Sequence, residues 1–236
     1  RYGQGANECW AFSVLYSVES IVNLYFNRQI NDELSVQNLI SCIDGVEWNV
    51  GYHPYKALDY AITNGIVDDD CLGYRSWYIR PCEDMCENPI ERVFINGRSN
   101  RFSGEINVKT YLITKGPIVT ELWPWRHAMS MVGFGVVKVG DPILYGNFNA
   151  GTGHDFVVEE DSPDIGKPYY IFKQSYATYG YDESHFCKII INANNSAYMT
   201  CYSIDTPITS MLHNNSDIDC ADNDGDGYYN WGIGPK

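Results

Sequence analysis

The first apolar residues of the chain recur at helical spacing. One helical face collects Ala11, Val14, Leu15, Val18, Val22 and Tyr25. Positions that repeat at three and four residues lie on one side of an α-helix and pack against a core. The pattern therefore predicts a long buried helix with Cys9 in its first turn.

Two shorter helices follow. The stretch "DELSVQNLISC" (32–42) has Ser35 as its expected N-cap. In "HPYKALDYAITNG" (53–65), Pro54 marks the start and Asn64-Gly65 marks the end. Residues 66–104 are rich in turn formers and cysteines, and we expect a loop there.

The pattern changes after Glu105. Four β-type runs, separated by Gly, Pro and Asp clusters, are "GPIVTEL", "HAMSMVGFGVV", "PYYIFKQSY" and "HFCKIIIN". A helical half followed by a β half predicts the α+β class. We expect a helical lobe over 1–104, a β lobe over 105–213 and an acidic tail or linker over 214–236.

Composition narrows the function classes. The chain has 236 residues and a formal net charge of -14, which argues against nucleic-acid binding because phosphates would be repelled. No apolar run reaches the length that a membrane span needs. We expect a monomer that is part of a longer polypeptide.

The chain has 8 cysteines, at positions 9, 42, 71, 82, 86, 187, 201 and 220. Their spacing does not suit zinc, because no second close pair or nearby histidine completes four ligands. Disulfides in an oxidising compartment fit better, so we predict an extracytoplasmic protein. Cys9 is then either one half of a disulfide or a reactive thiol, whose thiolate the helix N-terminus would favour.

Four segments favour the reactive thiol. "QGANECWAFS" resembles the Q-G-x-C-G-S-C-W-A-F-S sequence around the nucleophile of papain-like cysteine peptidases. "LSVQNLISC", "HAMSMVGFG" and "YYIFKQSYATYGYDESHFCKI" resemble three further segments of that family, in the same order, over roughly residues 1–205. The resemblance implies a two-lobed papain-like fold, with a β-barrel-like second lobe, and cysteine endopeptidase activity that needs no cofactor.

The resemblance also implies catalytic roles. Cys9 is the nucleophile, and His127 is its imidazolium partner in an ion pair. Gln4, with the backbone N–H of Cys9, stabilises the oxyanion. Gln174 stands where the family has the asparagine that orients the histidine, and Tyr176 replaces a tryptophan.

A further departure from the family precedes the nucleophile. Glu8 opposes ionisation of the thiol unless it points to solvent or pairs with a cation. This departure and those at Gln174 and Tyr176 keep open a second reading, a catalytically impaired peptide-binding or structural module. A calcium-dependent scaffold protein is a third.

The family resemblance assigns substrate-binding roles to some positions of this chain. The positions that the resemblance places along the peptide groove or at its rim are Gly51, Tyr52, His53, Glu121, Arg126 and Ala128. An extended peptide pairs with the backbone at Gly51 in the manner of an added strand. If Glu121 faces inward, the main specificity pocket favours a basic or polar side chain two residues before the cut.

The resemblance also guides the remaining cysteines and histidines. We expect disulfides among Cys42, Cys71, Cys82 and Cys86 with open connectivity, and a cross-strand disulfide between Cys187 and Cys201. Cys220 is left over. The insertion "VVKVGDPILYGNFNAGTGHDFVVEEDSPDIGKP" predicts a hairpin or loop away from the site or a flap over it, and its His154 is expected at the surface, like His185 and His213.

The tail carries one metal-binding pattern. Asp222, Asp224 and Asp226 alternate before Gly227, which resembles the first half of a calcium loop. Ile233 stands where such a loop needs glutamate. The tail therefore predicts weak Ca²⁺ binding, or otherwise a solvated acidic linker.

Overall fold

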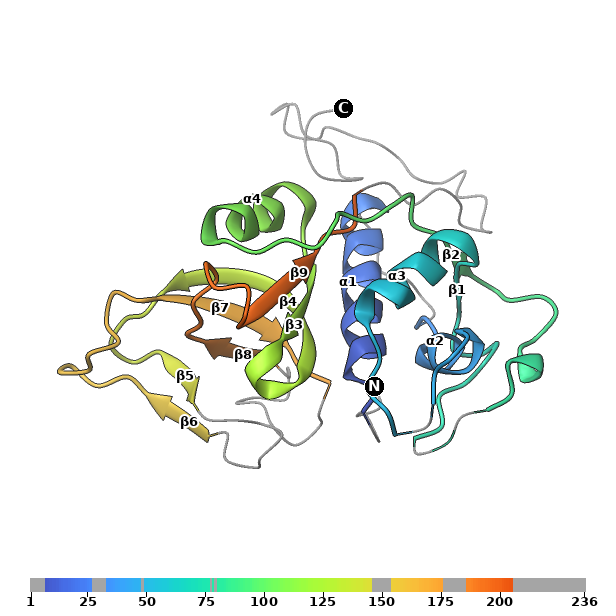
Figure 1. Cartoon of the computed structure of the whole chain (residues 1–236), viewed down its shortest axis with the longest axis horizontal. Coiled ribbons are helices and arrows are strands. Elements are labelled where there is room, and N and C mark those ends of the chain that lie inside the picture. Colours follow the sequence, from blue (N-terminus) through green and yellow to red (C-terminus); the bar gives the residue numbers. More distant parts are fainter. Residues whose placement is uncertain are drawn as a thin grey trace.

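The computed structural model describes residues 7–26, 33–47, 49–76, 78, 80–145, 154–175 and 186–205. Its helices are α1 (Cys9–Phe26), α2 (Val36–Cys42), α3 (Pro54–Thr63) and α4 (Glu105–Lys115), with short 3-10 turns η1 (Cys82–Asp84) and η2 (Trp123–Trp125). Figure 1 shows α1, α2 and α3 together in one half of the molecule and the larger sheet in the other.

The strands form three antiparallel sheets. The largest has the order β8-β7-β4-β3-β9, with bounds Phe186–Ile189, Pro168–Lys173, His127–Val136, Ile118–Leu122 and Met199–Tyr202. Two small sheets pair β1 (Ile66–Val67) with β2 (Arg92–Val93), and β5 (Pro142–Tyr145) with β6 (His154–Val157). Helices in one half and a sheet in the other confirm the predicted α+β class.

Helix α1 lies on the side of the helical half that faces the larger sheet (Figure 1), and most of its residues are buried. Leu15 and Val18 join a core cluster that also holds Leu58 of α3 and Val119 and Ala128 of the sheet. Polar residues of α1 are buried too, namely Ser13, Ser17 and Glu19, so elements cover the helix on more than its apolar face. More of the surface of α1 is therefore buried than the single apolar face that the sequence predicts.

Local signals place the next two helices as predicted. Ser35 caps α2, and its Oγ accepts a 2.9 Å hydrogen bond from the backbone N–H of Asn38. Pro54 opens α3, and Gly65 follows its end with a positive φ of 72°. A cap and a left-handed glycine satisfy backbone groups that a helix end leaves without partners.

Two disulfides hold the loop between β1 and β2. Cys42 at the end of α2 bonds Cys82 of η1, and Cys71 bonds Cys86. The prediction that these four cysteines pair among themselves is confirmed, and the connectivity is now defined. Such bonds fit an oxidising compartment.

The predicted disulfide between Cys187 and Cys201 is wrong. Neither residue is in a disulfide, and both side chains are buried. Cys187 lies on β8 and Cys201 on β9, which are opposite edges of the five-stranded sheet. A disulfide needs Cα atoms less than about 7 Å apart, and three intervening strands prevent that.

The second half holds its own core. Side chains of β3, β4 and β7 meet beneath α4, with Met131, Tyr170 and Phe172 fully or nearly fully buried. The insertion forms the hairpin β5–β6, in which His154 pairs with Tyr145. The predicted boundaries of the two lobes stay a prediction.

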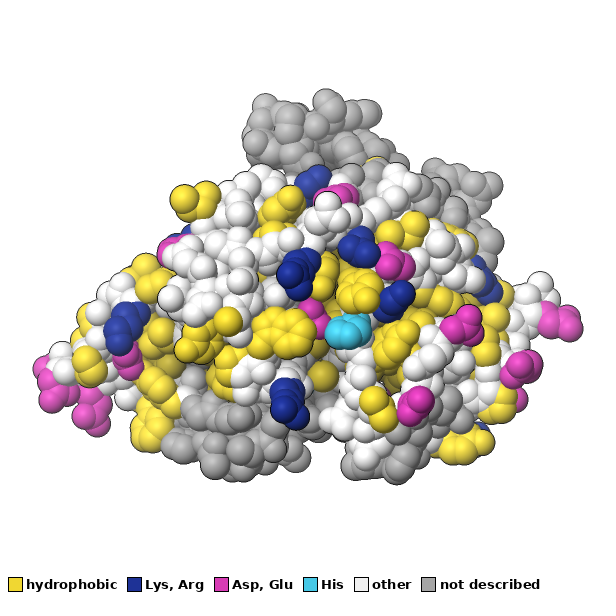
Figure 2. All heavy atoms as spheres, viewed as in Figure 1, with side chains coloured by type: hydrophobic (Ala, Val, Ile, Leu, Met, Phe, Trp, Pro, Cys, Tyr) yellow, Lys and Arg dark blue, Asp and Glu magenta, His cyan; other side chains and the backbone are white. Residues whose placement is uncertain are grey.

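Acidic side chains are exposed on the loop that follows β6. Figure 2 shows acidic side chains gathered at the far left of the view, over the loop that follows β6, where Glu159, Glu160 and Asp161 are exposed.

Among the helices in the described ranges, none combines the length and apolar character of a membrane-crossing segment.

Candidate active site

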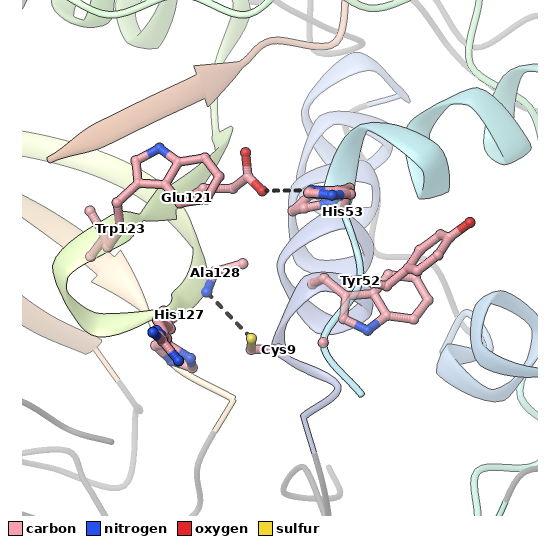
Figure 3. Close-up of a pocket in the computed structure, with 12 residues that line it drawn as sticks. Cys9, Tyr52, His53, Glu121, Trp123, His127 and Ala128 are labelled. Carbon is pink, nitrogen blue, oxygen red and sulfur yellow. Dashed lines mark hydrogen bonds and ion pairs between the residues drawn. The ribbon is translucent and has the colours of Figure 1, made fainter. Parts of the chain in front are cut away.

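Cys9 is the first residue of α1 and is not part of a disulfide. Its Sγ accepts a 3.4 Å hydrogen bond from the backbone N–H of Ala128, the second residue of β4. Figure 3 shows the sulfur between the strand that carries His127 and the segment that carries Tyr52. The hypothesis that Cys9 is one half of a disulfide is therefore excluded, and the reactive thiol remains.

His127 and Gln174 come from neighbouring strands. His127 begins β4, and Gln174 directly follows β7, which pairs with β4. Both side chains are buried, at 3% and 1% exposed. The sheet therefore brings two residues that are 47 positions apart in the sequence into one site next to the start of α1.

Gln174 contacts His127 through its side chain. Their side-chain hydrogen bond raises the pKa of His127, against the larger lowering by burial. However, Oε1 of Gln174 has no partner with regular hydrogen-bond geometry in the described part of the chain. Its Nε2 lies 3.7 Å from Sγ of Cys187. The side chain of Gln174 therefore interacts with both the imidazole of His127 and the thiol of Cys187.

Burial favours the neutral forms of both catalytic candidates. It raises the pKa of Cys9 to about 11, although backbone N–H groups of Ala128, Trp10 and Cys9 itself act in the opposite direction. It lowers the pKa of His127 to about 4. Removing charged groups from water disfavours ionisation. Both shifts oppose a resting thiolate–imidazolium pair, so that pair stays a prediction.

Glu8 is directed away from the sulfur. It is 7% exposed, and its Oε2 accepts a 2.5 Å hydrogen bond from the hydroxyl of Tyr74. The carboxylate whose charge raises the pKa of Cys9 is instead Glu121. Glu121, and not Glu8, is therefore the carboxylate whose charge opposes ionisation of Cys9.

A pocket of about 200 Å³ opens beside Cys9. All six predicted substrate-binding residues line it, together with side chains that the sequence analysis did not select. The full lining is Cys9, Trp10, Gly51, Tyr52, His53, Pro54, Glu121, Leu122, Trp123, Arg126, His127 and Ala128. Residues from both halves of the molecule thus enclose one concave site, as ligand sites commonly are.

Glu121 faces into this pocket from β3. Its Oε1 lies 3.7 Å from Nδ1 of His53, and its Oε2 accepts a 3.2 Å hydrogen bond from the hydroxyl of Tyr202 (Figure 3 shows Glu121 opposite His53). Tyr202 was missed from the sequence. The pairing of β3 with β9 brings it there, and only the apolar run around Cys201 hinted at a strand.

Several predicted positions lie outside the described residues. These are Gln4, Tyr176, His185, His213, Cys220, Asp222, Asp224 and Asp226. Within the ranges that the structure does describe, no three His, Cys, Asp or Glu side chains gather as a metal site. The calcium prediction for the tail is therefore not tested.

Comparison with known proteins defines the class. The model of the family described as "Papain family cysteine protease" matches residues 4–206. The chain therefore belongs to the papain family of cysteine proteases, which are hydrolases that need no cofactor for catalysis. The two-lobed papain-like fold expected from the sequence is confirmed.

Relatives of this chain are distant. Cathepsin S of Bos taurus is 25% identical over 191 residues, which cover 78% of this chain and 54% of that protein. Cathepsin 7 of Rattus norvegicus is 32% identical over 123 residues, or 50% of this chain and 35% of that protein. The chain spans at most about half the length of the curated relatives that it matches.

Solved structures agree in fold. A cysteine protease of Carica candamarcensis has a TM-score of 0.58 at 19% identity, covering 86% of this chain and 90% of that one. Procathepsin B S9 of Trypanosoma congolense has a TM-score of 0.63 at 15% identity, covering 86% and 71%. At these identities the likeness concerns the fold alone.

Proposed function

We propose that this chain hydrolyses peptide bonds as a cysteine endopeptidase with Cys9 as its nucleophile. The observation that carries the proposal is the free thiol of Cys9, which sits in a pocket with His127 and accepts a hydrogen bond from Ala128. A thiol next to an imidazole in a concave site suits acyl transfer.

The proposed reaction has two steps. Sγ of Cys9 bonds to the scissile carbonyl carbon while its proton passes to His127. His127 then protonates the leaving amine as the C–N bond breaks. Water hydrolyses the resulting thioester, with His127 as the base, and the thiol of Cys9 is restored.

Two other groups assist in this proposal. The side chain of Gln4 and the backbone N–H of Cys9 donate to the oxyanion, an effect of about 3 kcal/mol per donor. Gln174 orients the imidazole of His127 through its amide. The substrate backbone pairs as an added strand at Gly51, between the walls that hold Tyr52 and Arg126.

The setting of the enzyme belongs to the same proposal. The two disulfides support an extracytoplasmic location. We assign the chain to a monomeric part of a longer polypeptide, with Asp222, Asp224 and Asp226 binding Ca²⁺ weakly. Calcium titration by calorimetry tests the tail, and the absence of binding heat removes that part alone.

Covalent labelling tests the nucleophile. The Carica candamarcensis protease was solved in complex with E-64, and this compound is the probe for the intact chain. We expect one adduct, located on Cys9 by peptide mapping, that forms in proportion to the loss of peptidase activity. The Cys9→Ser variant is the control and takes no label. Cleavage that survives full labelling of Cys9 contradicts the proposal.

A second candidate function is peptide binding without turnover. The observation that favours it is the pair of pKa shifts, to about 11 for Cys9 and about 4 for His127, which keep both groups neutral. This candidate predicts that peptides bind in the pocket without being cut. It also predicts that E-64 does not label Cys9. Calorimetry with an uncut peptide, run beside the E-64 experiment, separates the two.

A further inference from the structure

Glu121 gives the pocket beside Cys9 a buried carboxylate. We propose that Glu121 selects substrates that carry lysine or arginine in this pocket, which the family resemblance assigns to the residue two before the scissile bond. This inference rests on the proposed peptidase function and names its substrate class.

The surroundings leave the carboxylate short of partners. Glu121 is 9% exposed, and much of the lining around it is apolar, including Trp10, Leu122, Trp123 and Ala128. A carboxylate accepts about four hydrogen bonds, and burying its charge without a cation is costly. A cationic side chain that enters the pocket would provide the missing partner.

His53 is a weak internal partner for this carboxylate. The Nδ1–Oε1 distance of 3.7 Å is long for a hydrogen bond, and the side chain of His53 is 57% exposed. Histidine is a cation only when protonated, and a partly exposed pair contributes little. Arginine, which is permanently charged and meets carboxylates with two parallel hydrogen bonds, can displace His53.

Tyr202 fixes the carboxylate without neutralising it. Its hydroxyl donates a 3.2 Å hydrogen bond to Oε2 of Glu121. The other oxygen, Oε1, is the one that faces His53. Arg98 lies over the ring of Tyr202 at 5.9 Å, but its guanidinium is bound by both carboxylate oxygens of Asp59, at 2.7 and 3.1 Å. Arg98 therefore pairs with Asp59 and does not neutralise Glu121.

Arg126 is the lining residue that argues for the opposite charge. It enters the pocket from the turn before β4, beside His127. An acidic substrate side chain would be favoured if Arg126 rather than Glu121 met it. The ion pair described for Glu121 is with His53, so the test includes an acidic peptide to separate the two residues.

Glu121 also affects the nucleophile. Its charge contributes to the raised pKa of Cys9, after the larger effect of burial. A bound cation offsets this negative charge. Removing the charge of Glu121 should therefore slow the cleavage of cationic substrates more than that of neutral substrates, whereas a merely structural defect would lower both equally.

The experiment uses the whole chain and peptides that differ only two residues before the cut. Lysine is compared with norleucine and arginine with citrulline, which have nearly the same shape without the charge, and glutamate is the acidic peptide. The enzymes are the unaltered chain, Glu121→Gln and the matched control Glu105→Gln. Glu105 lies on α4 and pairs with Lys109, away from the pocket.

We expect the unaltered chain to show a kcat/KM at least about tenfold higher for lysine than for norleucine. In Glu121→Gln this ratio should fall to near one, because cleavage of the lysine peptide drops more than cleavage of the norleucine peptide. Glu105→Gln should keep the original ratio. His53→Gln, which removes the competing partner, should raise the ratio and serves as the second variant if Glu121→Gln does not fold.

Three results overturn the inference. They are equal cleavage of lysine and norleucine peptides, a preference for glutamate, and an unchanged ratio in folded Glu121→Gln. In each case the peptides are still cut, so the peptidase proposal stands. If no peptide is cut and E-64 does not label Cys9, the peptidase proposal fails instead. Calorimetry with the lysine and norleucine peptides then decides, and equal affinities overturn the role of Glu121.

Discussion

The backbone N–H of Ala128 donates a hydrogen bond to Sγ of Cys9 across 3.4 Å. This contact joins the first residue of α1 to the second residue of β4, which are 119 positions apart in the sequence. A donor aimed at the sulfur favours its ionised form. Helix and sheet therefore meet at the atom on which the proposed chemistry depends.

The titration of Cys9 provides the first prediction. Because burial raises the pKa of Cys9 to about 11, ionisation should continue far above pH 7 in the absence of substrate. Iodoacetamide alkylation, followed on the peptide that contains Cys9, should accelerate steadily up to pH 10. A plateau below pH 8 would contradict this and would demonstrate a resting ion pair with His127.

The second prediction concerns stability in acid. The pKa of His127 is lowered by burial from 6.5 to about 4. Between these values the unfolded imidazole binds a proton and the folded one does not. The stabilisation is complete above pH 6.5 and is lost as the pH falls through 4, up to about 3 kcal/mol at about 1.4 kcal/mol per tenfold change.

Urea unfolding of the unaltered chain and of His127→Gln measures this loss. The free energy of unfolding should decline more steeply in the unaltered chain between pH 6.5 and 4, because glutamine does not titrate. Other acidic groups affect both proteins alike and cancel in the difference. Parallel pH profiles of the two proteins would show that folding does not lower the pKa of His127.

Local sequence signals predicted the helical half well. Ser35 and Pro54 act within one turn of themselves, so their roles could be inferred without the fold. Helix α4 was not predicted, because only Val108 of its apolar residues is fully buried, while Ile106 is 81% exposed. Val108, Tyr111 and Leu112 follow helical spacing and pack on the core, but the exposed apolar residues Ile106 and Ile113 obscure that face in the sequence.

Long-range pairing limited the prediction of the site. Cys187 and Cys201 looked like a cross-strand pair because they are near in sequence, but sheet order separates them. The same order brings Tyr202 to Glu121, since β9 pairs with β3. The contacts of Glu121, unlike the caps of α2 and α3, depend on strand register that residue spacing alone does not define.

The third prediction compares the two disulfides. Cys42–Cys82 closes a segment with a sequence separation of 40, and Cys71–Cys86 one of 15. In the chain-entropy model these loops stabilise the fold by about 4 and about 3 kcal/mol. The double serine variant at Cys42 and Cys82 should therefore unfold at lower urea concentration than the one at Cys71 and Cys86. The reverse order would indicate that local packing, not loop closure, dominates.

The fourth prediction tests Gln174 as a positioning residue. Its Oε1 is buried without a hydrogen-bond partner among the residues described, so the amide does not use its full hydrogen-bonding capacity at His127. Asparagine, which the family resemblance places here, carries the same amide on a shorter side chain. Gln174→Asn should raise kcat/KM by about tenfold, which is a part of the roughly 10²- to 10⁴-fold effect of a positioned acid or base. Gln174→Ala should lower it.

The pH profile of kcat/KM distinguishes orientation from simple packing. A better amide partner stabilises the protonated imidazole, so Gln174→Asn should move the acidic limb of the profile to higher pH. A packing effect would change the rate without moving the limb. If Gln174→Asn and Gln174→Ala reduce activity equally, the longer side chain of glutamine is the one that His127 requires. The departure from the family would then be an adaptation of this site rather than an impairment.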